Sequence, residues 1–156
     1  MDEGYMIGAY SIVYGIEDAR WLAFNIGRLY AQLDEFSIVI GPVAPIFGEE
    51  RDTESEDFLR AIPDPDNKVR IRSGVWANKN LMAEVACEEL KSDIIFQIDA
   101  DEIWPSGLVQ ESLKALAEGA RKVRFHMYTF WKTPEYVVTT PDIVGFASKC
   151  LGISRE

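Results

Sequence analysis

The sequence predicts a single α/β domain with a mostly parallel sheet of about five or six strands flanked by helices. Two observations lead to this prediction. Apolar runs typical of strands alternate with amphipathic segments long enough to form helices, which is the pattern of βαβ units. The chain also has 156 residues and 47% hydrophobic residues, enough for one core, and contains no internal repeat or linker that would divide it.

The first third of the chain contains two predicted strands with a helix between them. Residues 5–14 are rich in β-branched and aromatic side chains and predict the first strand. A helix is expected next, because apolar side chains recur at helical spacing and Glu17 and Asp18 lie in its first turn, where acids suit the helix dipole. Residues 36–40 predict the second strand, which ends at Gly41. The apolar stripe of the helix consists of Leu22, Ile26, Leu29 and Leu33.

The alternation continues after a break. Residues 43–67 are rich in proline, glycine and acids and predict no strand, and the acidic runs at 52–57 and 64–66 indicate an exposed loop or short helix. Residues 132–156 have no clear assignment, so the predicted domain is best defined over 5–131. The other predicted elements are strands over 69–75, 94–98 and 122–131, a helix over 78–91 and a helix opened by residues 105–107.

Composition excludes several classes of protein. A disordered or collagen-like chain would have fewer apolar and aromatic residues, and no apolar run approaches the roughly 20 residues that cross a bilayer. The net charge of −10 argues against binding a nucleic-acid backbone, which requires clustered Lys and Arg. The acidic N-terminus lacks the basic region of a signal peptide, and Cys87 and Cys150 lie in unrelated contexts that indicate no disulfide framework. We therefore expect a cytoplasmic protein without a transmembrane segment.

The most informative segment is the apolar run that ends in Asp99, Asp101 and Glu102. Ligands of open α/β sheets bind beyond the carboxyl ends of such strands. Asp99 and Asp101 lie two residues apart, so in extended backbone their side chains leave the same face and can converge on one ion. A hard divalent cation such as Mg²⁺, held by one or two carboxylates plus substrate phosphates, fits this spacing. The simpler interpretation is that the acids only cap the next helix or solvate a turn.

Other candidate residues carry weaker signals. Lys79 begins a predicted helix, where the dipole disfavours an amine, so it is either a phosphate contact or an exposed lysine. His126 lies mid-strand and is more often packed or solvated than functional in such a position. The glycine-rich nucleotide motifs and the G-x-S-x-G nucleophile motif are absent from the sequence. Three tryptophans lie near predicted strand ends, as core residues or as platforms for a sugar or base: Trp76, Trp104 and Trp131.

The chain resembles the nucleotide-sugar-binding half of family 2 glycosyltransferases of the A-type fold, over roughly residues 5–131. The resemblance rests on the order of elements and on three segments, of which the Asp-Ala-Asp-Glu form of the D-x-D motif, also found in bacterial and phage-type members, is the most specific. The three segments are residues 11–18 (SIVYGIED), 78–80 (NKN) and 96–102 (FQIDADE).

This resemblance implies a metal-dependent transferase that uses a nucleotide-diphospho-sugar donor. Asp101 would coordinate Mn²⁺ or Mg²⁺ on the donor diphosphate, and Asp99 would share that ion or bind the donor ribose. Tyr14 would flank the base, Glu17 would match the acidic residue near the nucleotide, and Lys79 would face the diphosphate. A divalent ion suits the reaction because it stabilises the charge that develops on the leaving diphosphate.

The sequence departs from the family pattern in two places. The family has an Asp after the second strand that reads the base, where this chain has Gly41 and a proline. The catalytic base of the family lies beyond the fifth strand, where Glu135 and Asp142 are the only carboxylates before Glu156, so no base is assigned. The expected chain is therefore a truncated, minimal or inactive member. Two alternatives stay open: a non-catalytic nucleotide-sugar-binding module, and another Mg²⁺-dependent α/β enzyme such as a nucleotidyltransferase.

Overall fold

The computed structural model describes residues 4–44, 46, 48–105, 107–127, 130–131, 133–137 and 147–154, with side chains as far as residue 123. The elements up to residue 97 are β1 (Ile7–Val13), α1 (Ile16–Leu29), a 3-10 turn (Tyr30–Gln32), β2 (Glu35–Ile40), α2 (Thr53–Arg60), β3 (Val69–Ser73), α3 (Lys79–Glu88) and β4 (Ile94–Gln97). The later elements are α4 (Leu108–Ala117), β5 (Lys122–Met127), β6 (Phe130–Trp131), β7 (Thr133–Val137) and β8 (Ala147–Ser154).

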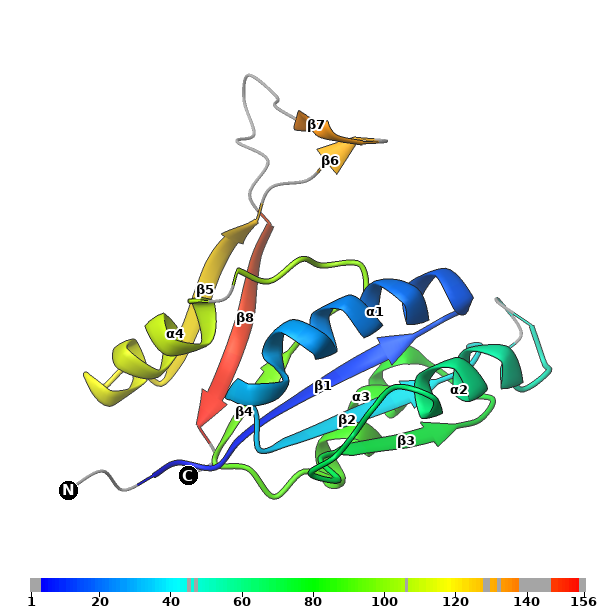
Figure 1. The fold of residues 1–156 in the computed structure, drawn as a ribbon, viewed down its shortest axis with the longest axis horizontal. Coiled ribbons are helices and arrows are strands. Elements are labelled where there is room, and N and C mark those ends of the chain that lie inside the picture. The colour runs from blue at the N-terminus through cyan, green and yellow to red at the C-terminus, as the bar shows by residue number, and fades with distance from the viewer. Residues whose placement is uncertain are drawn as a thin grey trace.

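The main sheet has the strand order β3-β2-β1-β4-β8-β5 (Figure 1). Strands β3, β2, β1 and β4 are all parallel, whereas β8 runs antiparallel to both β4 and β5. Strands β6 and β7 pair with each other in a separate ribbon. The predicted α/β class is confirmed, but the all-parallel part contains four strands and is smaller than the five or six expected.

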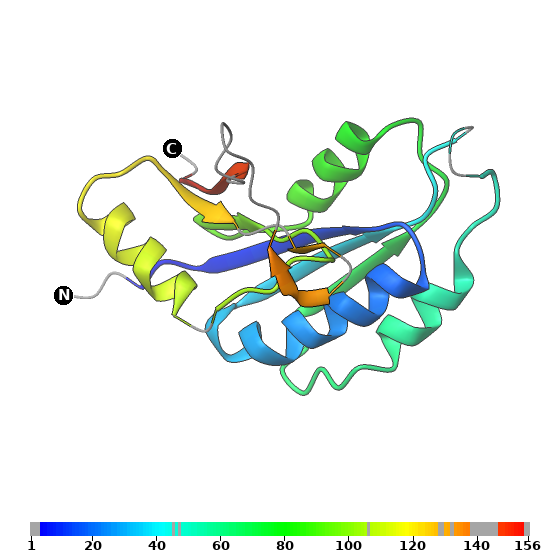
Figure 2. The ribbon, with the colours of Figure 1, turned by 90° about the horizontal axis from the view of Figure 1, so that it is seen from above.

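Helices cover both faces of the parallel strands. Figure 2 shows α1 and α2 on one face and α3 on the other. The alternation of side chains along β2 reflects this arrangement: Ile38 and Ile40 join the core under α1 and α2, while Val39 joins the core under α3. All six residues of β2 are buried, as expected for a parallel strand covered on both faces. Among the described residues, no helix combines the length and apolar character needed to cross a bilayer.

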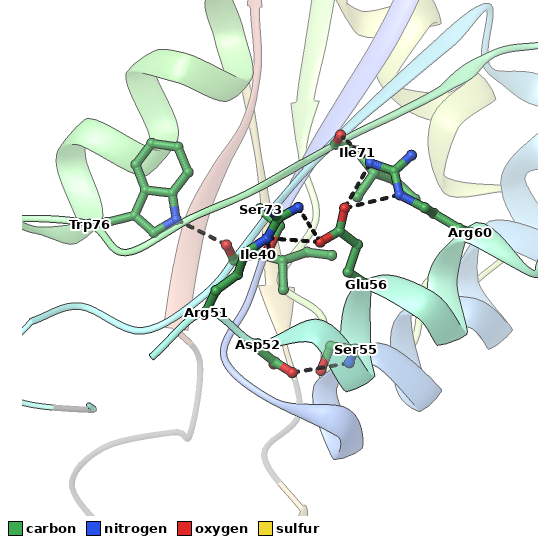
Figure 3. A network of polar contacts seen from close by, with 9 residues as sticks. All are labelled: Ile40, Arg51, Asp52, Ser55, Glu56, Arg60, Ile71, Ser73 and Trp76. Atoms are coloured by element: carbon green, nitrogen blue, oxygen red, sulfur yellow. Dashed lines mark hydrogen bonds and ion pairs between the residues drawn. The ribbon is translucent and has the colours of Figure 1, made fainter. Parts of the chain in front are cut away.

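The acidic run at 52–57 was expected to form an exposed loop or a short helix. It forms the first part of helix α2. Asp52 caps it by accepting a hydrogen bond from the Ser55 amide (3.0 Å). Not all of this run is exposed, since Glu56 is buried and binds Arg51 (2.6 Å) and Arg60 (2.9 Å). In Figure 3 these arginines also reach β3, with Arg51 Nε donating to Ser73 Oγ (3.1 Å) and Arg60 Nη2 to the Ile71 carbonyl (3.3 Å). The ion pairs thus attach α2 to the edge strand.

Two predicted strands have different bounds. The strand expected over 94–98 ends at Gln97, and the one expected over 122–131 is divided into β5 and β6. The 132–156 segment, which had no assignment, contains β7 and β8. The predicted fifth strand therefore does not extend the parallel sheet directly, because β8 lies between β4 and β5.

Candidate functional site

The candidate site is a cleft of about 280 Å³ where β1 and β4 end. From β1 the chain builds outward through β2 to β3 and then returns to place β4 on the other side of β1, so β1 and β4 flank a topological switch point. Ligands of open α/β sheets bind at such a point, in the crevice beyond the carboxyl ends of the strands. The cleft is lined by Ile12, Tyr14, Asp18, Lys79, Asp99, Ala100 and Asp101.

The two acidic residues of the D-x-D motif lie in a turn and not in extended backbone. The Glu102 amide donates to the Asp99 carbonyl (3.1 Å), which closes a four-residue turn over 99–102. The Glu102 carboxylate accepts a hydrogen bond from the Asp99 amide (3.1 Å) within the same turn. Asp99 and Asp101 both line the cleft even so. Both residues therefore reach the cleft from a turn rather than from extended backbone. We refer to residues 99–102 as the acidic turn.

Asp99 and Asp101 differ in exposure. Asp99 is half-buried and accepts a hydrogen bond from Gln97 Nε2 (3.2 Å) on its Oδ1 oxygen, whereas Asp101 is exposed. An exposed carboxylate reaches a solvated ion with little loss of its own hydration, while a half-buried one is more fixed in position. The pair suits a cation that enters from solvent and keeps part of its hydration shell, as Mg²⁺ does.

Tyr14 stands on the β1 side of the cleft, and 37% of the residue is exposed. Its amide donates to Asp18 Oδ2 (3.0 Å), which ties the end of β1 to the first turn of α1. Burial raises the pKa of the Tyr14 phenol, and the negative charges of Asp99 and Asp18 raise it further. The phenol therefore keeps its proton at neutral pH and offers a neutral, amphipathic ring to a ligand.

Lys79 is the first residue of α3 and lines the cleft from the opposite face. Asn78 fixes the start of this helix, because its side chain accepts a hydrogen bond from the Leu81 amide (2.9 Å). The cap directs the first turn of α3, and Lys79 with it, toward the edge of the sheet that carries the acidic turn. The sequence left two interpretations of Lys79, an exposed lysine and a phosphate contact. The structure fits both, because Lys79 is exposed and lines the cleft.

Glu17 is placed differently from the other predicted site residues. Its side chain is 73% exposed and pairs with Arg20 (2.6 Å) on the surface of α1, and it is not among the cleft-lining residues. Its neighbour Asp18 lines the cleft instead. Asp18 accepts a hydrogen bond from the Tyr14 amide, and this contact distinguishes it from Glu17.

The tryptophans serve the core and the loops. Trp104 is buried and packs edge-on against Phe96, with ring centroids 5.8 Å apart. Trp76 donates its indole N–H to the Ile40 carbonyl (3.0 Å), as drawn in Figure 3. Neither lines the cleft, so the core interpretation of these two fits better. The side chains of Trp131, His126, Glu135 and Asp142 lie outside the described residues.

The charge in the cleft favours a cation. Three carboxylates line it (Asp18, Asp99 and Asp101), against one cationic side chain, Lys79. Within the part of the chain that the structure describes, no three His, Cys, Asp or Glu side chains are grouped closely enough to form a complete metal centre. Asp99 and Asp101 are thus the pair that would hold Mg²⁺ or Mn²⁺, with phosphate oxygens and water as the remaining ligands.

A second cavity, of about 320 Å³, lies between α1, α2 and β3. Both of its charged side chains have internal partners: Arg60 binds Glu56, and Asp64 accepts hydrogen bonds from Tyr30 Oη (2.6 Å) and from the amides of Lys68 and Val69. These bonds lie within α2 and between the 3-10 turn, the loop before β3 and the first residue of β3, so the charged side chains of this cavity already have structural partners. The cleft at the switch point is therefore the stronger candidate.

Comparison with known proteins adds no identification. No protein-family model matches the chain, and no curated protein is significantly similar to it.

Proposed function

We propose that the chain is the donor-binding domain of a metal-dependent glycosyltransferase that moves a sugar from a nucleotide-diphospho-sugar to an acceptor. The observation that carries the proposal is the acidic turn at the topological switch point, where Asp99 and Asp101 line one cleft with Lys79 and Tyr14. A bound Mn²⁺ or Mg²⁺ would offset the charge of the carboxylates, and a diphosphate held by that ion would receive Lys79 as a second cationic partner.

The residues of the cleft have separate roles in this proposal. Asp101 and Asp99 hold the cation, which stabilises the charge of the departing nucleoside diphosphate. Lys79 contacts a phosphate oxygen as a point charge. Tyr14, half-exposed and neutral, flanks the nucleobase. Deprotonation of the acceptor hydroxyl would require a carboxylate base, and none is assigned among these residues.

Replacing Asp101 with asparagine is expected to weaken Mn²⁺-dependent binding of UDP by at least about thirtyfold, or about 2 kcal/mol, because an amide is a neutral and poorer ligand for a hard cation. Titration calorimetry of UDP in the presence of Mn²⁺ measures this directly. Asp57→Asn is the matched control, since Asp57 is an exposed acid on α2, away from the cleft.

Absence of UDP binding by the intact protein, or equal binding by the Asp101→Asn protein, would contradict the proposal. Binding without transfer of sugar to any acceptor or to water would instead identify a non-catalytic binding module. Turnover of nucleoside triphosphates in place of sugar nucleotides would favour a nucleotidyltransferase.

The loops that follow β2 and β3 bear on which nucleobase is bound. Backbone hydrogen bonds connect these two segments to each other. The Gly74 amide donates to the Ile40 carbonyl (3.0 Å), and the Trp76 amide donates to the Pro42 carbonyl (2.9 Å). The indole N–H of Trp76 is also bonded to Ile40. At the end of β2, where the family has a base-reading Asp, the described side chains are apolar. The hydrogen bonds above join this segment to the loop that follows β3.

We expect the site to discriminate poorly between nucleobases as a result. UDP, GDP and ADP should bind with affinities within about tenfold of one another in the presence of Mn²⁺, because large discrimination requires buried polar groups that the wrong base leaves unpaired. The same calorimetric assay makes the comparison, with inorganic pyrophosphate as the reference for the diphosphate alone. A preference of more than about a hundredfold for one base would show that a polar group reads it.

A further inference from the structure

Buried polar side chains from two other elements hold both ends of the acidic turn. Before the turn, Ser11 of β1 donates its hydroxyl to the Ile98 carbonyl (2.5 Å). After it, Asn25 of α1 donates its side-chain amide to the Glu102 carbonyl. Ser11 and Asn25 are each only 1% exposed. In Figure 1 the segment that follows β4 passes alongside α1, which brings these partners together although 77 residues separate Asn25 from Glu102.

The contacts continue beyond the turn. Asn25 Oδ1 accepts a hydrogen bond from the Trp104 amide (3.4 Å), so one side chain bonds the backbone on both sides of residue 103. The Glu102 carboxylate accepts from the Asp99 amide (3.1 Å) and from the Trp104 indole (3.2 Å). The acidic turn is thus attached to β1 through Ser11, to α1 through Asn25, and to the core through the Trp104 ring.

These bonds do more than satisfy buried polar atoms. Apolar side chains would fill the same space under α1 without the cost of burying an amide and a hydroxyl. Carboxylates brought to one cleft repel each other, which disfavours the turn that carries them, and contacts from outside the turn offset this repulsion. Outer contacts that orient metal-binding carboxylates affect metal affinity strongly, because they fix the ligands before the ion arrives.

We propose that Ser11 and Asn25 are positioning residues that preform the acidic turn. Ser11 fixes the backbone directly before Asp99, and Asn25 fixes the backbone directly after Asp101. Neither residue lines the cleft, so both act through the turn and not on the ligand. The consequence for cation binding rests on the proposed function, whereas the rigidity of the turn does not.

The chain provides a matched pair of serines for the test. Ser37 lies in the neighbouring strand β2, fully buried like Ser11, but its hydroxyl has no hydrogen-bond partner among the described residues. Ser11→Ala should accelerate hydrogen exchange at the amides of Asp99, Glu102 and Trp104 and weaken Mn²⁺ binding in the presence of UDP by about tenfold. Ser37→Ala should change neither quantity. Asn25→Ala should reproduce the effect of Ser11→Ala from the other end of the turn.

Two measurements separate this inference from the proposed function. Amide hydrogen exchange measured by NMR reports the rigidity of the acidic turn. Electron paramagnetic resonance of free Mn²⁺ reports the affinity of the folded protein for Mn²⁺. Equal exchange in Ser11→Ala and Ser37→Ala would overturn the inference, whatever happens to the metal. Faster exchange with unchanged Mn²⁺ affinity would also overturn the positioning role. If the intact protein binds no Mn²⁺, the proposed function fails, and faster exchange in Ser11→Ala would still support the preformed turn.

Discussion

Replacing Glu35 with alanine is expected to destabilise the protein by about 3 kcal/mol, because the change leaves several buried donors without an acceptor. Glu35 is 1% exposed at the start of β2 and pairs with Arg70 of β3 (2.7 Å). Its other oxygen accepts hydrogen bonds from the Ser92 amide and hydroxyl (both 2.6 Å) and from the Lys91 amide. One carboxylate thus joins β2, β3 and the loop that leads into β4. Chemical denaturation gives the free energy of unfolding.

The loss of stability at acid pH tests the role of the same Glu35 carboxylate. Burial alone would raise the pKa of Glu35, but the hydrogen bonds from Ser92, Arg70 and Lys91 outweigh it and lower the pKa below the ordinary value of 4.5. A lowered pKa in the folded state stabilises the protein above about pH 4.5, and this contribution is lost as the pH falls through the folded-state pKa. Glu35→Gln should therefore lose stability at neutral pH and show a smaller decline on acidification.

Glu17→Gln is the control, because Glu17 pairs with Arg20 at a similar distance (2.6 Å) but on the surface. Exposed pairs contribute little, so this change should leave the free energy of unfolding nearly unaltered. Equal losses in the Glu35 and Glu17 variants would contradict the role assigned to burial.

The second large effect is expected at Gly41, where alanine should cost more than about 3 kcal/mol through backbone strain and steric overlap. Gly41 has φ = 130°, a conformation that residues with a Cβ rarely adopt. A Cβ there would overlap the carbonyl oxygen of Gly74 and lie 3.0 Å from its carbonyl carbon. The Gly74 backbone has little freedom to withdraw, since its amide is bonded to Ile40 (3.0 Å).

Gly27→Ala is the matched comparison. Gly27 lies on the exposed face of α1, and a Cβ there meets no atom within 4 Å. Alanine should stabilise this helix by up to about 1 kcal/mol, because glycine loses more backbone entropy on folding. Thermal unfolding of the two variants should shift the midpoint in opposite directions. A Gly41→Ala protein as stable as the original would refute the close approach of the two loops.

Most of the parallel half of the fold could be predicted from local signals. The apolar run of β2 and the stripe of α1 each identify an element without tertiary information. Strand β8 could not be predicted in this way. It pairs antiparallel between β4 and β5, and its residues, including Gly152, have neither clean alternation nor a continuous apolar run. Its position depends on long-range pairing, which spacing along the chain does not encode.

The candidate site, like the fold, could be predicted only where local signals identify its residues. Asp99 and Asp101 were predicted as site residues because they follow a buried strand, Lys79 because of its place at a helix start and the family resemblance, and Tyr14 from the resemblance alone; all four line the cleft. Glu17 and Asp18 were harder to distinguish, since adjacent residues at a helix start point in different directions and only the contact with the Tyr14 amide decides between them. The bonds from Ser11 and Asn25 connect residues more than 70 positions apart, so no local pattern predicts them.

The place of β8 in the sheet has a consequence for the order of folding. Strand β4, which leads into the acidic turn, has β1 on one side and β8 on the other, and its pairing with β8 joins Ile94 to Ser154 and Ile95 to Ile153. During synthesis the first four strands are complete well before residues 147–154 emerge, so β4 is an open sheet edge for that interval. Contacts this distant in sequence form slowly. The strand that ends at the cleft is therefore enclosed on both sides only after β8 has formed, and until then its open edge can pair with other chains.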